Sequence, residues 1–160
     1  MKQKMWPYIA IGIAFCLGVG FLASMATQMS VNTWYKALAK PFFTPPNWLF
    51  APVWSLLYVL MGVSVGRVMY YGLHHLWGKT ALYHFGFQLL FNGLWSMVFF
   101  GLRKPILALL IILILLALIE RTIKWFRTVD KLSAQILYPY FLWVIYATLL
   151  NVGIVFLNFL

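Results

Sequence analysis

Acidic side chains are almost missing from this 160-residue chain, which has two Asp or Glu residues against twelve Lys or Arg. The two acids, Glu120 and Asp130, both lie among basic residues, so the paired carboxylates that general acid–base catalysis uses have no candidates. Charged residues of all kinds make up 9% of the sequence and hydrophobic residues 64%. A water-soluble domain could not bury so much apolar surface, and the composition therefore predicts an integral membrane protein.

Metal ligands and reactive nucleophiles are also scarce. The only cysteine, Cys16, lies in the first apolar run, which excludes a disulfide within the chain and predicts a small packing residue. The histidines, His74, His75 and His84, have no acid or thiol beside them, so we expect no metal site. Neither a glycine-rich phosphate loop nor a nucleophile with a base is found, and the sequence predicts no catalytic residue and no required cofactor.

Apolar runs of membrane-spanning length fill most of the chain. They predict an all-α fold in which one domain, residues 1–160, is a single bundle of five transmembrane helices at about 6–29, 48–71, 80–102, 105–126 and 133–158. The uncharged part of the fourth run ends at Ile119, so we expect that helix to continue through Glu120 with its charges at the lipid headgroups. Pro139 predicts a local kink in the last helix.

Basic residues gather in the short connections between these runs. Such clusters are typical of membrane topology and of contact with anionic lipid, so we expect membrane lipid and no nucleic acid as a partner despite the formal charge of +10. One side of the membrane would hold Lys2, Lys4, Arg67, Lys79, Arg121, Lys124, Arg127 and Lys131, and the other Lys36, Lys40, Arg103 and Lys104. Eight against four predicts a cytoplasmic N-terminus, with the first loop on the outer face.

The first loop, residues 30–47, separates two apolar runs and is rich in proline and aromatic residues. Prolines stop helices and remove backbone donors, so the segment predicts a compact, partly rigid loop. We expect it to act as a lid over the ends of the helices through Trp34, Pro41, Phe43, Pro45 and Pro46.

Polar and aromatic side chains recur on single faces of three expected helices. In a bilayer such side chains face the protein interior, because exposure to lipid is costly. These faces predict a cavity for a flat apolar ligand with a few polar atoms, lined by Trp54, Tyr58, Gln88, Asn92, Trp95, Tyr140, Trp143, Ala147 and Asn151, with Asn158 on the same stripe. Spacing alone leaves open that these residues only hold helices together. Ala147, a small residue between large neighbours, favours a cavity.

Small residues form another stripe on the expected second helix, where Gly62 and Gly66 make a GxxxG pair. Such a pair predicts helix packing at close approach. The sequence leaves open whether the neighbouring helix belongs to the same chain or to a second copy.

Three segments, in this order, resemble the translocator protein (TspO/MBR) family, also called tryptophan-rich sensory proteins or peripheral-type benzodiazepine receptors. They are WYKALAKPFFTPPNWLFAPVWSLLYVLMG at 34–62, FNGLWSMVFFGLRK at 91–104 and LYPYFLWVIYATLLN at 137–151. The resemblance implies a bacterial-type member in the cell membrane, a five-helix bundle that forms a homodimer. It also implies binding of tetrapyrroles such as protoporphyrin IX or haem, and of isoquinoline-carboxamide or benzodiazepine ligands.

The family motifs carry site residues over to this chain. They imply a pocket beneath the first loop that includes Leu150 together with Trp54, Asn92, Trp95, Trp143 and Ala147. The family often has a tryptophan where this chain has Phe43, so one aromatic contact differs. Three functions are compatible with these residues: a receptor, sensor or carrier for porphyrin-like molecules, an enzyme that degrades porphyrin with light and oxygen through its tryptophans, and a membrane assembly protein that uses the Gly62 and Gly66 face.

Overall fold

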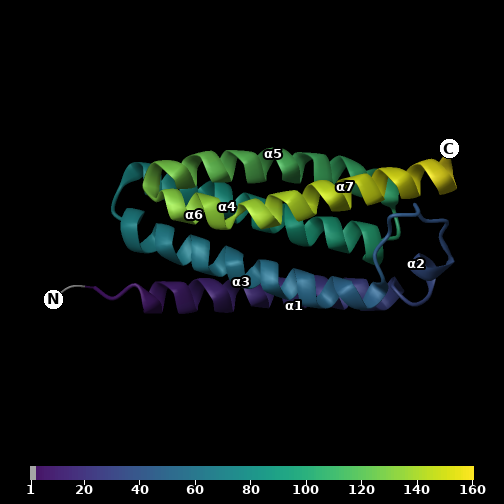
Figure 1. Cartoon of the computed structure of the whole chain (residues 1–160), viewed down its shortest axis with the longest axis horizontal. Coiled ribbons are helices and arrows are strands. Elements are labelled where there is room, and N and C mark those ends of the chain that lie inside the picture. The colour runs from purple at the N-terminus through teal and green to yellow at the C-terminus, as the bar shows by residue number, and fades with distance from the viewer. Residues whose placement is uncertain (1–2) are drawn as a thin grey trace.

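The computed structural model describes residues 3–160, and these form only helices and connecting turns (Figure 1). Five long helices run along one common axis: α1 (Trp6–Ser30), α3 (Asn47–Gly72), α4 (Leu76–Ser96), α5 (Pro105–Val129) and α7 (Tyr138–Phe159). Three short elements connect or extend them: α2 (Trp34–Ala37), the π-helical turn η1 (Met97–Gly101) and α6 (Lys131–Ile136). The start of α1 and the end of α7 lie at opposite ends of the bundle.

Four segments of the described chain are long and apolar enough to cross a membrane: α1, α3, α5, and α6 with α7 taken as one run. The all-α fold is therefore confirmed for the described residues, and these four segments are consistent with an integral membrane protein. Five crossings were predicted, but only four segments of the described chain meet this requirement of length and hydropathy. The fifth long helix, α4, does not meet it, and it carries the polar side chains of His84, Gln88 and Asn92.

The helix boundaries differ from the predicted ones at three places. The predicted third helix began at residue 80, but α4 begins at Leu76, because the backbone of His75 is extended and the helix starts directly after it. The fourth was predicted to end at residue 126 and ends at Val129, just before Asp130 caps the next helix. The last one is two helices separated at Leu137, because Pro139 in the first turn of α7 has no backbone N–H with which to continue α6.

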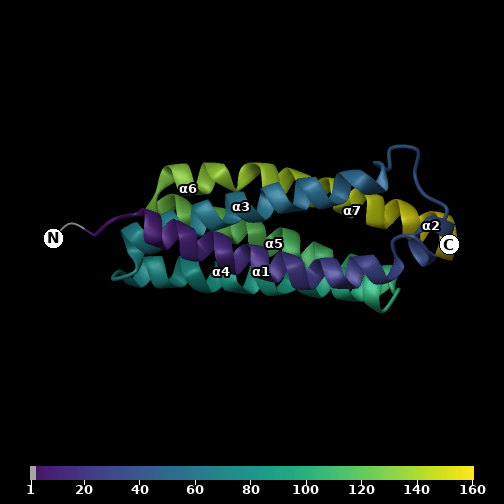
Figure 2. The ribbon, with the colours of Figure 1, turned by 90° about the horizontal axis from the view of Figure 1, so that it is seen from below.

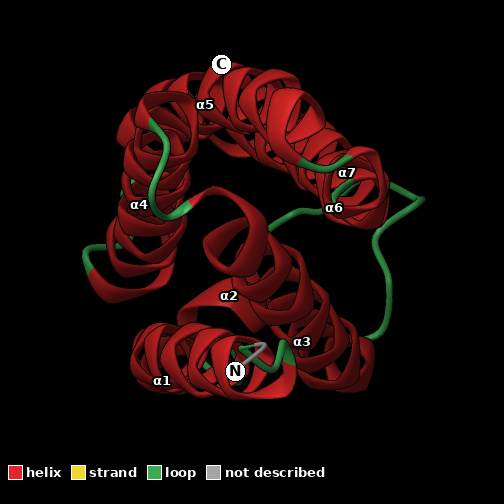
Figure 3. Cartoon of the chain, turned by 90° about the vertical axis from the view of Figure 1, so that its left-hand side faces the viewer, coloured by secondary structure: helices red, strands yellow, loops and turns green. Residues whose placement is uncertain are grey.

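The helices form a ring in the order α1, α3, α6 with α7, α5 and α4 (Figure 3). The small-residue face of α3 is used within this ring. A Cβ added to Gly62 would lie 2.3 Å from Cα of Ile13, and one added to Gly66 would lie 2.5 Å from Cα of Ile9. The helix that approaches this face is thus α1 of the same chain, which leaves no room there for a second copy.

An ion pair joins α3 to the α5–α6 turn at the end of the bundle opposite the first loop. Nε of Arg67 lies 2.8 Å from Oδ2 of Asp130, and both side chains are about four-fifths buried, with exposures of 18% and 17%. The same oxygen accepts bonds from the hydroxyl of Ser133 at 2.6 Å and its backbone N–H at 3.2 Å, which caps α6. Burial alone would raise the pKa of Asp130, but these hydrogen bonds outweigh it and lower that pKa.

We expect Asp130→Asn to lower the free energy of unfolding by about 1.5–3 kcal/mol at pH 7, because it weakens a charge-assisted bond and leaves Arg67 without a counter-charge. A carboxyl whose pKa is lowered in the folded state contributes stability that is present above its unfolded pKa of about 3.9 and is lost as the pH falls through the folded value. The melting temperature of the variant in detergent should accordingly lose part of its dependence on pH below about pH 4.

Glu120→Gln is the matched control, because Glu120 pairs with Lys124 at 2.8 Å on an exposed surface. Exposed pairs contribute little, and this variant should melt close to the wild type. Equal melting temperatures for Asp130→Asn and the wild type at pH 7 would contradict a stabilising role for the ion pair.

Candidate functional site

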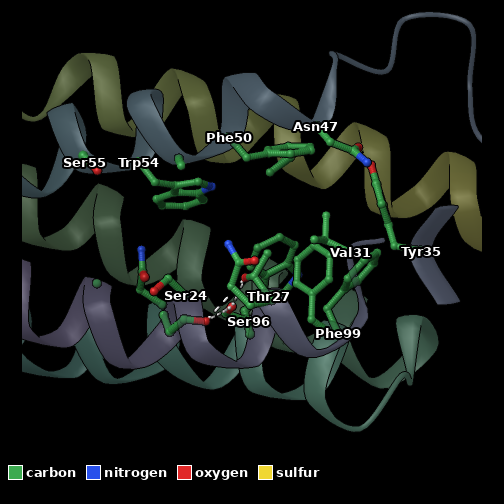
Figure 4. A pocket seen from close by; sticks show the side chains of 18 of the residues that line it. Ser24, Thr27, Val31, Tyr35, Asn47, Phe50, Trp54, Ser55, Ser96 and Phe99 are labelled. Atoms are coloured by element: carbon green, nitrogen blue, oxygen red, sulfur yellow. Dashed lines mark hydrogen bonds between the residues drawn. The ribbon is translucent and has the colours of Figure 1, made fainter. Parts of the chain in front are cut away.

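A cavity of about 710 Å³ lies at the loop end of the bundle, between α1, α3, α4, η1 and α7 and beneath α2. Figure 4 shows side chains that line it, with Trp54 and Phe50 on α3 facing Ser24 and Thr27 on α1 across the open space. Its volume is in the roughly 300–1,000 Å³ range of small-molecule sites. The loop end of this helical ring can therefore hold an organic ligand of moderate size.

Three tryptophans form the apolar wall of the cavity. The ring of Trp54 is tilted by 33° to that of Trp95 at a centroid distance of 6.4 Å, and it is nearly perpendicular to that of Trp143 at the same distance. The residue one turn after Trp54 on α3 is Tyr58, and their rings lie 5.8 Å apart. This arrangement presents ring faces and ring edges to the same space, which suits a flat aromatic ligand.

The turn η1 adds Phe99 and Phe100 to this wall. In η1 the backbone N–H of Leu102 bonds to the carbonyl of Met97 at 2.9 Å, five residues earlier, so this turn is wider than an α-helical one. Arg103 follows with a φ of 58°, a left-handed conformation that is uncommon for a residue other than glycine. The sequence predicts ordinary helix here, because a π-helical turn has no distinctive pattern of residues.

A chain of hydrogen bonds forms the inner end of the cavity. The hydroxyl of Tyr58 donates to Oδ1 of Asn92 at 2.5 Å, and Nδ2 of Asn92 donates to the hydroxyl of Tyr140 at 2.8 Å. That hydroxyl in turn donates to Oε1 of Gln88 at 2.7 Å. All four side chains are at least 95% buried. Each of these four side chains therefore has a hydrogen-bond partner in this water-poor interior.

The indole N–H groups of the cavity differ in their partners. Nε1 of Trp95 donates to Oδ1 of Asn151 at 3.0 Å, and Nδ2 of Asn151 donates to the carbonyl of Pro105 at 2.9 Å. By contrast, Nε1 of Trp143 is buried without a partner, and it is the one buried side-chain nitrogen or oxygen in this state among residues 3–160. A buried donor without an acceptor is costly, so this indole of the cavity wall is a locally unfavourable feature of the structure.

The lining of the cavity is electrically neutral. No Lys, Arg, His, Asp or Glu is found among the described residues that line it. A charged group deep inside would remain uncompensated, which is expensive in a medium of low dielectric constant. The inner part of the site therefore suits an uncharged ligand or the uncharged part of a larger one.

Eight of the ten predicted ligand-binding residues line the cavity, namely Trp54, Tyr58, Asn92, Trp95, Trp143, Ala147, Leu150 and Asn151. Gln88 and Tyr140 do not line it and lie one layer deeper, where they hold Asn92. Sequence reasoning missed the wall that α1 supplies with Leu17, Phe21, Ser24 and Gln28. Their spacing of i, i+4, i+7 and i+11 places them on one face, and the polar members Ser24 and Gln28 in an apolar run were a signal that could have found them.

The first loop covers the cavity, and α2 lies within it. Tyr35 on α2 is 2% exposed and lines the cavity, and Trp34 packs edge to face on Phe99 at 5.7 Å. The ammonium of Lys40 donates to the carbonyls of Tyr35, Lys36 and Leu38 and so caps α2. Burial lowers the pKa of Lys40.

Side chains of α7 hold the rest of the loop. Oδ1 of Asn158 accepts the backbone N–H of Ala39 at 3.0 Å, and its amide donates to the carbonyl of the same residue at 2.8 Å. Asn158 was predicted to share a cavity-facing stripe and instead fastens the loop, because it lies beyond the end of the cavity. Pro41 packs on Gly153, Tyr146 donates to the carbonyl of Phe43, and Pro45 and Pro46 directly precede α3.

Known proteins resemble this chain over nearly its whole length. The TspO/MBR family model matches residues 12–157. A tryptophan-rich protein TspO of Archaeoglobus fulgidus is 40% identical over 152 residues, which cover 94% of this chain and 96% of the relative. The protein of the same name from Chlorobaculum tepidum is 37% identical over 150 residues, covering 94% and 95%. The translocator protein of Homo sapiens is 33% identical over 157 residues, covering 91% and 88%.

Proposed function

Because this chain belongs to the TspO/MBR family, we propose that it is a membrane receptor, sensor or carrier for flat, lipid-soluble aromatic molecules of the porphyrin type. The observation that supports this most directly is the neutral, tryptophan-walled cavity with one unpartnered indole donor. Isoquinoline-carboxamide and benzodiazepine compounds share the same chemistry, a flat aromatic body with few polar atoms. They are proposed as synthetic ligands of this site.

A flat ligand would stack on Trp54 and Trp95 and meet Trp143 at its edge, because the first two rings are within 33° of parallel and the third is nearly perpendicular to Trp54. Aromatic pairs of this kind add about 0.5–1.5 kcal/mol each beyond the burial of area. A carbonyl oxygen at the edge of the ligand would accept the N–H of Trp143. Carboxylates of a porphyrin would stay at the exposed rim, since the interior offers them no cation.

Haem and metal-free porphyrin make different demands on the site. Haem iron in proteins is held by His, Cys, Met or Tyr. Of these types, the described cavity lining contains only Tyr35 and Tyr58, and the hydroxyl of Tyr58 is engaged with Asn92. Tyr35 is thus the one lining residue of the described chain with a free side chain of these types, and on this ground we propose the metal-free macrocycle as the better ligand.

Trp143→Phe is expected to weaken binding of an isoquinoline carboxamide about 5- to 10-fold, because it removes the free donor and keeps an aromatic ring. The measurement is an equilibrium titration of purified protein in detergent, followed by the absorbance or fluorescence of the ligand rather than of the indoles. Protoporphyrin IX is titrated in the same way.

Trp6→Phe is the control for the loss of an indole, because Trp6 is 66% exposed on α1 and does not line the cavity. It should bind both ligands like the wild type. If Trp143→Phe also binds both like the wild type, Nε1 of Trp143 does not contact the ligand. If the wild type binds neither, the proposed function is wrong.

We further propose that α4 with η1 is the fifth membrane crossing. Leu76 to Gly101 is a continuous helical segment of 26 residues, and roughly 20 suffice to span a bilayer. Its polar residues Gln88, Asn92 and Trp95 face the interior and not lipid. With five crossings, Lys4 just before α1 lies on the same side as Arg121 to Lys131, which supports a cytoplasmic N-terminus in a cell membrane.

A further inference from the structure

The walls of the cavity differ in their exposure. The lining residues on α4, η1 and α7 are buried or half-buried, including Asn92, Phe99 and Ala147. The exposed lining residues lie on α1 and α3 and at the ends of the first loop. They are Leu17, Phe21, Ser24, Gln28 and Asn32 on one side and Asn47, Trp48, Ala51 and Ser55 on the other. The cavity therefore opens sideways, between α1 and α3.

The opening ends at two places along the bundle axis. On the side away from the first loop, α1 and α3 are in close contact, since a Cβ on Gly20 would lie 2.5 Å from the ring of Tyr58. Toward the loop end the two helices separate (Figure 2), and there Val31 and Tyr35 cover the cavity with exposures of 7% and 2%. Between these ends the α1 stripe from Phe21 to Gln28 rises by roughly 10 Å. A flat molecule turned edge-on, with its thin dimension across the gap, can pass through an opening of this height.

The two edges of the opening carry polar groups at positions that face lipid. Ser24 and Gln28 on α1 and Ser55 on α3 are exposed, although polar side chains on the lipid face of a membrane helix are unfavourable and mark functional positions. The hydroxyl of Ser24 donates to the carbonyl of Phe21 at 2.7 Å, whereas the amide of Gln28 makes no hydrogen bond within the described part of the chain. These groups can contact the polar edge of a molecule that passes between the helices.

We propose that the gap between α1 and α3 is a lateral portal, through which a ligand dissolved in the loop-side half of the bilayer enters the cavity. Gln28 contacts the carboxyl or amide edge of the ligand and selects for it. This inference rests on the proposed function. The alternative route, past the first loop, requires release of a segment that Asn158, Gly153 and Tyr146 hold to α7.

The portal is tested by the rates of protoporphyrin IX binding in stopped flow, with the protein in lipid nanodiscs. Phenylalanine at both Ser24 and Ser55 narrows the gap, so association and dissociation should both slow at least 10-fold. Ala117→Phe adds the same group at an exposed position of α5 and should leave both rates unchanged. Asn158→Ala frees the loop and should also leave association unchanged.

A separate variant tests the contact proposed between Gln28 and the polar edge of the ligand. Gln28→Leu should slow association of protoporphyrin IX by 3- to 10-fold and slow that of its dimethyl ester less, because the ester carbonyl is a weaker acceptor for the amide than a carboxylate. An equal effect on both compounds, or none on either, overturns the selecting role of Gln28.

The outcomes separate the portal from the function on which it rests. Normal equilibrium binding with unchanged rates in the Ser24→Phe and Ser55→Phe double variant overturns the portal and leaves the proposed function intact. Faster association in Asn158→Ala overturns the portal in favour of the loop route. No equilibrium binding to the wild type refutes the proposed function, and the portal with it.

Discussion

Gly62→Ala is expected to destabilise the folded protein by about 3 kcal/mol, the upper end of the usual cost of overpacking. The added methyl group would lie 2.3 Å from Cα and 2.5 Å from N of Ile13 and 2.8 Å from the carbonyl carbon of Gly12. These are backbone atoms, so no side-chain rotation relieves the contact and α1 must move away from α3. The measurement is thermal or denaturant unfolding in detergent.

Gly18→Ala is the matched control for this variant. Gly18 is also in a helix, on α1, and a Cβ there would meet nothing within 4 Å. The control should unfold like the wild type. If Gly62→Ala is as stable as Gly18→Ala, then α1 does not pack on α3 as described. Packing within the chain also removes the main support for an assembly role of the Gly62 and Gly66 face.

Asn92→Leu is the second variant with a large expected effect, because Asn92 is the centre of the buried hydrogen-bond chain. It removes the acceptor of Tyr58 and the donor to Tyr140 while keeping a side chain of similar size. Each buried polar group left without a partner costs about 1–3 kcal/mol. We expect a loss of about 2–4 kcal/mol in unfolding free energy and at least a 10-fold loss of affinity for protoporphyrin IX, since Tyr58 and Asn92 both line the cavity.

A double-mutant cycle of Asn92→Leu with Tyr140→Phe shows whether the buried hydrogen bonds of Asn92 and Tyr140 act as one unit. The phenylalanine removes the hydroxyl that links Asn92 to Gln88 and leaves the cavity lining unchanged, because Tyr140 lies behind it. Groups in one network couple by about 0.5–3 kcal/mol. Additive stability losses in the double variant would argue that the two bonds are independent. The conservative variant Asn92→Gln should recover part of the affinity if the amide itself contacts the ligand.

Much of the candidate site was predictable because helical periodicity places residues on faces. Trp54 with Tyr58, and Asn92 with Trp95, follow the spacing of neighbouring turns, and both pairs line one cavity. The resemblance drawn from their motifs to the translocator protein family is confirmed by the family model. The same reasoning placed Gln88 with them, although it lies one layer deeper, because periodicity gives direction and not depth.

Other parts of the structure depend on contacts that no local pattern encodes. The π-helical turn η1 and the left-handed Arg103 arise where the chain leaves α4 for Pro105. Asn158 fastens the loop because the backbone of Ala39 lies beside it, 119 residues away in sequence. Residues of α1 line the cavity only because α3 separates from α1 between Gly20 and the first loop.

The sequence by itself determined that the protein is helical, lies in a membrane and belongs to its family, because hydropathy, charge clusters and motifs are properties of neighbouring residues. Only the tertiary structure decided what each face meets. It showed that Gly62 packs on α1 of its own chain, that Trp143 is left with a free donor and that the cavity opens between α1 and α3. The physical reason is that packing distances and unpaired donors depend on how distant helices cross, which one sequence does not specify.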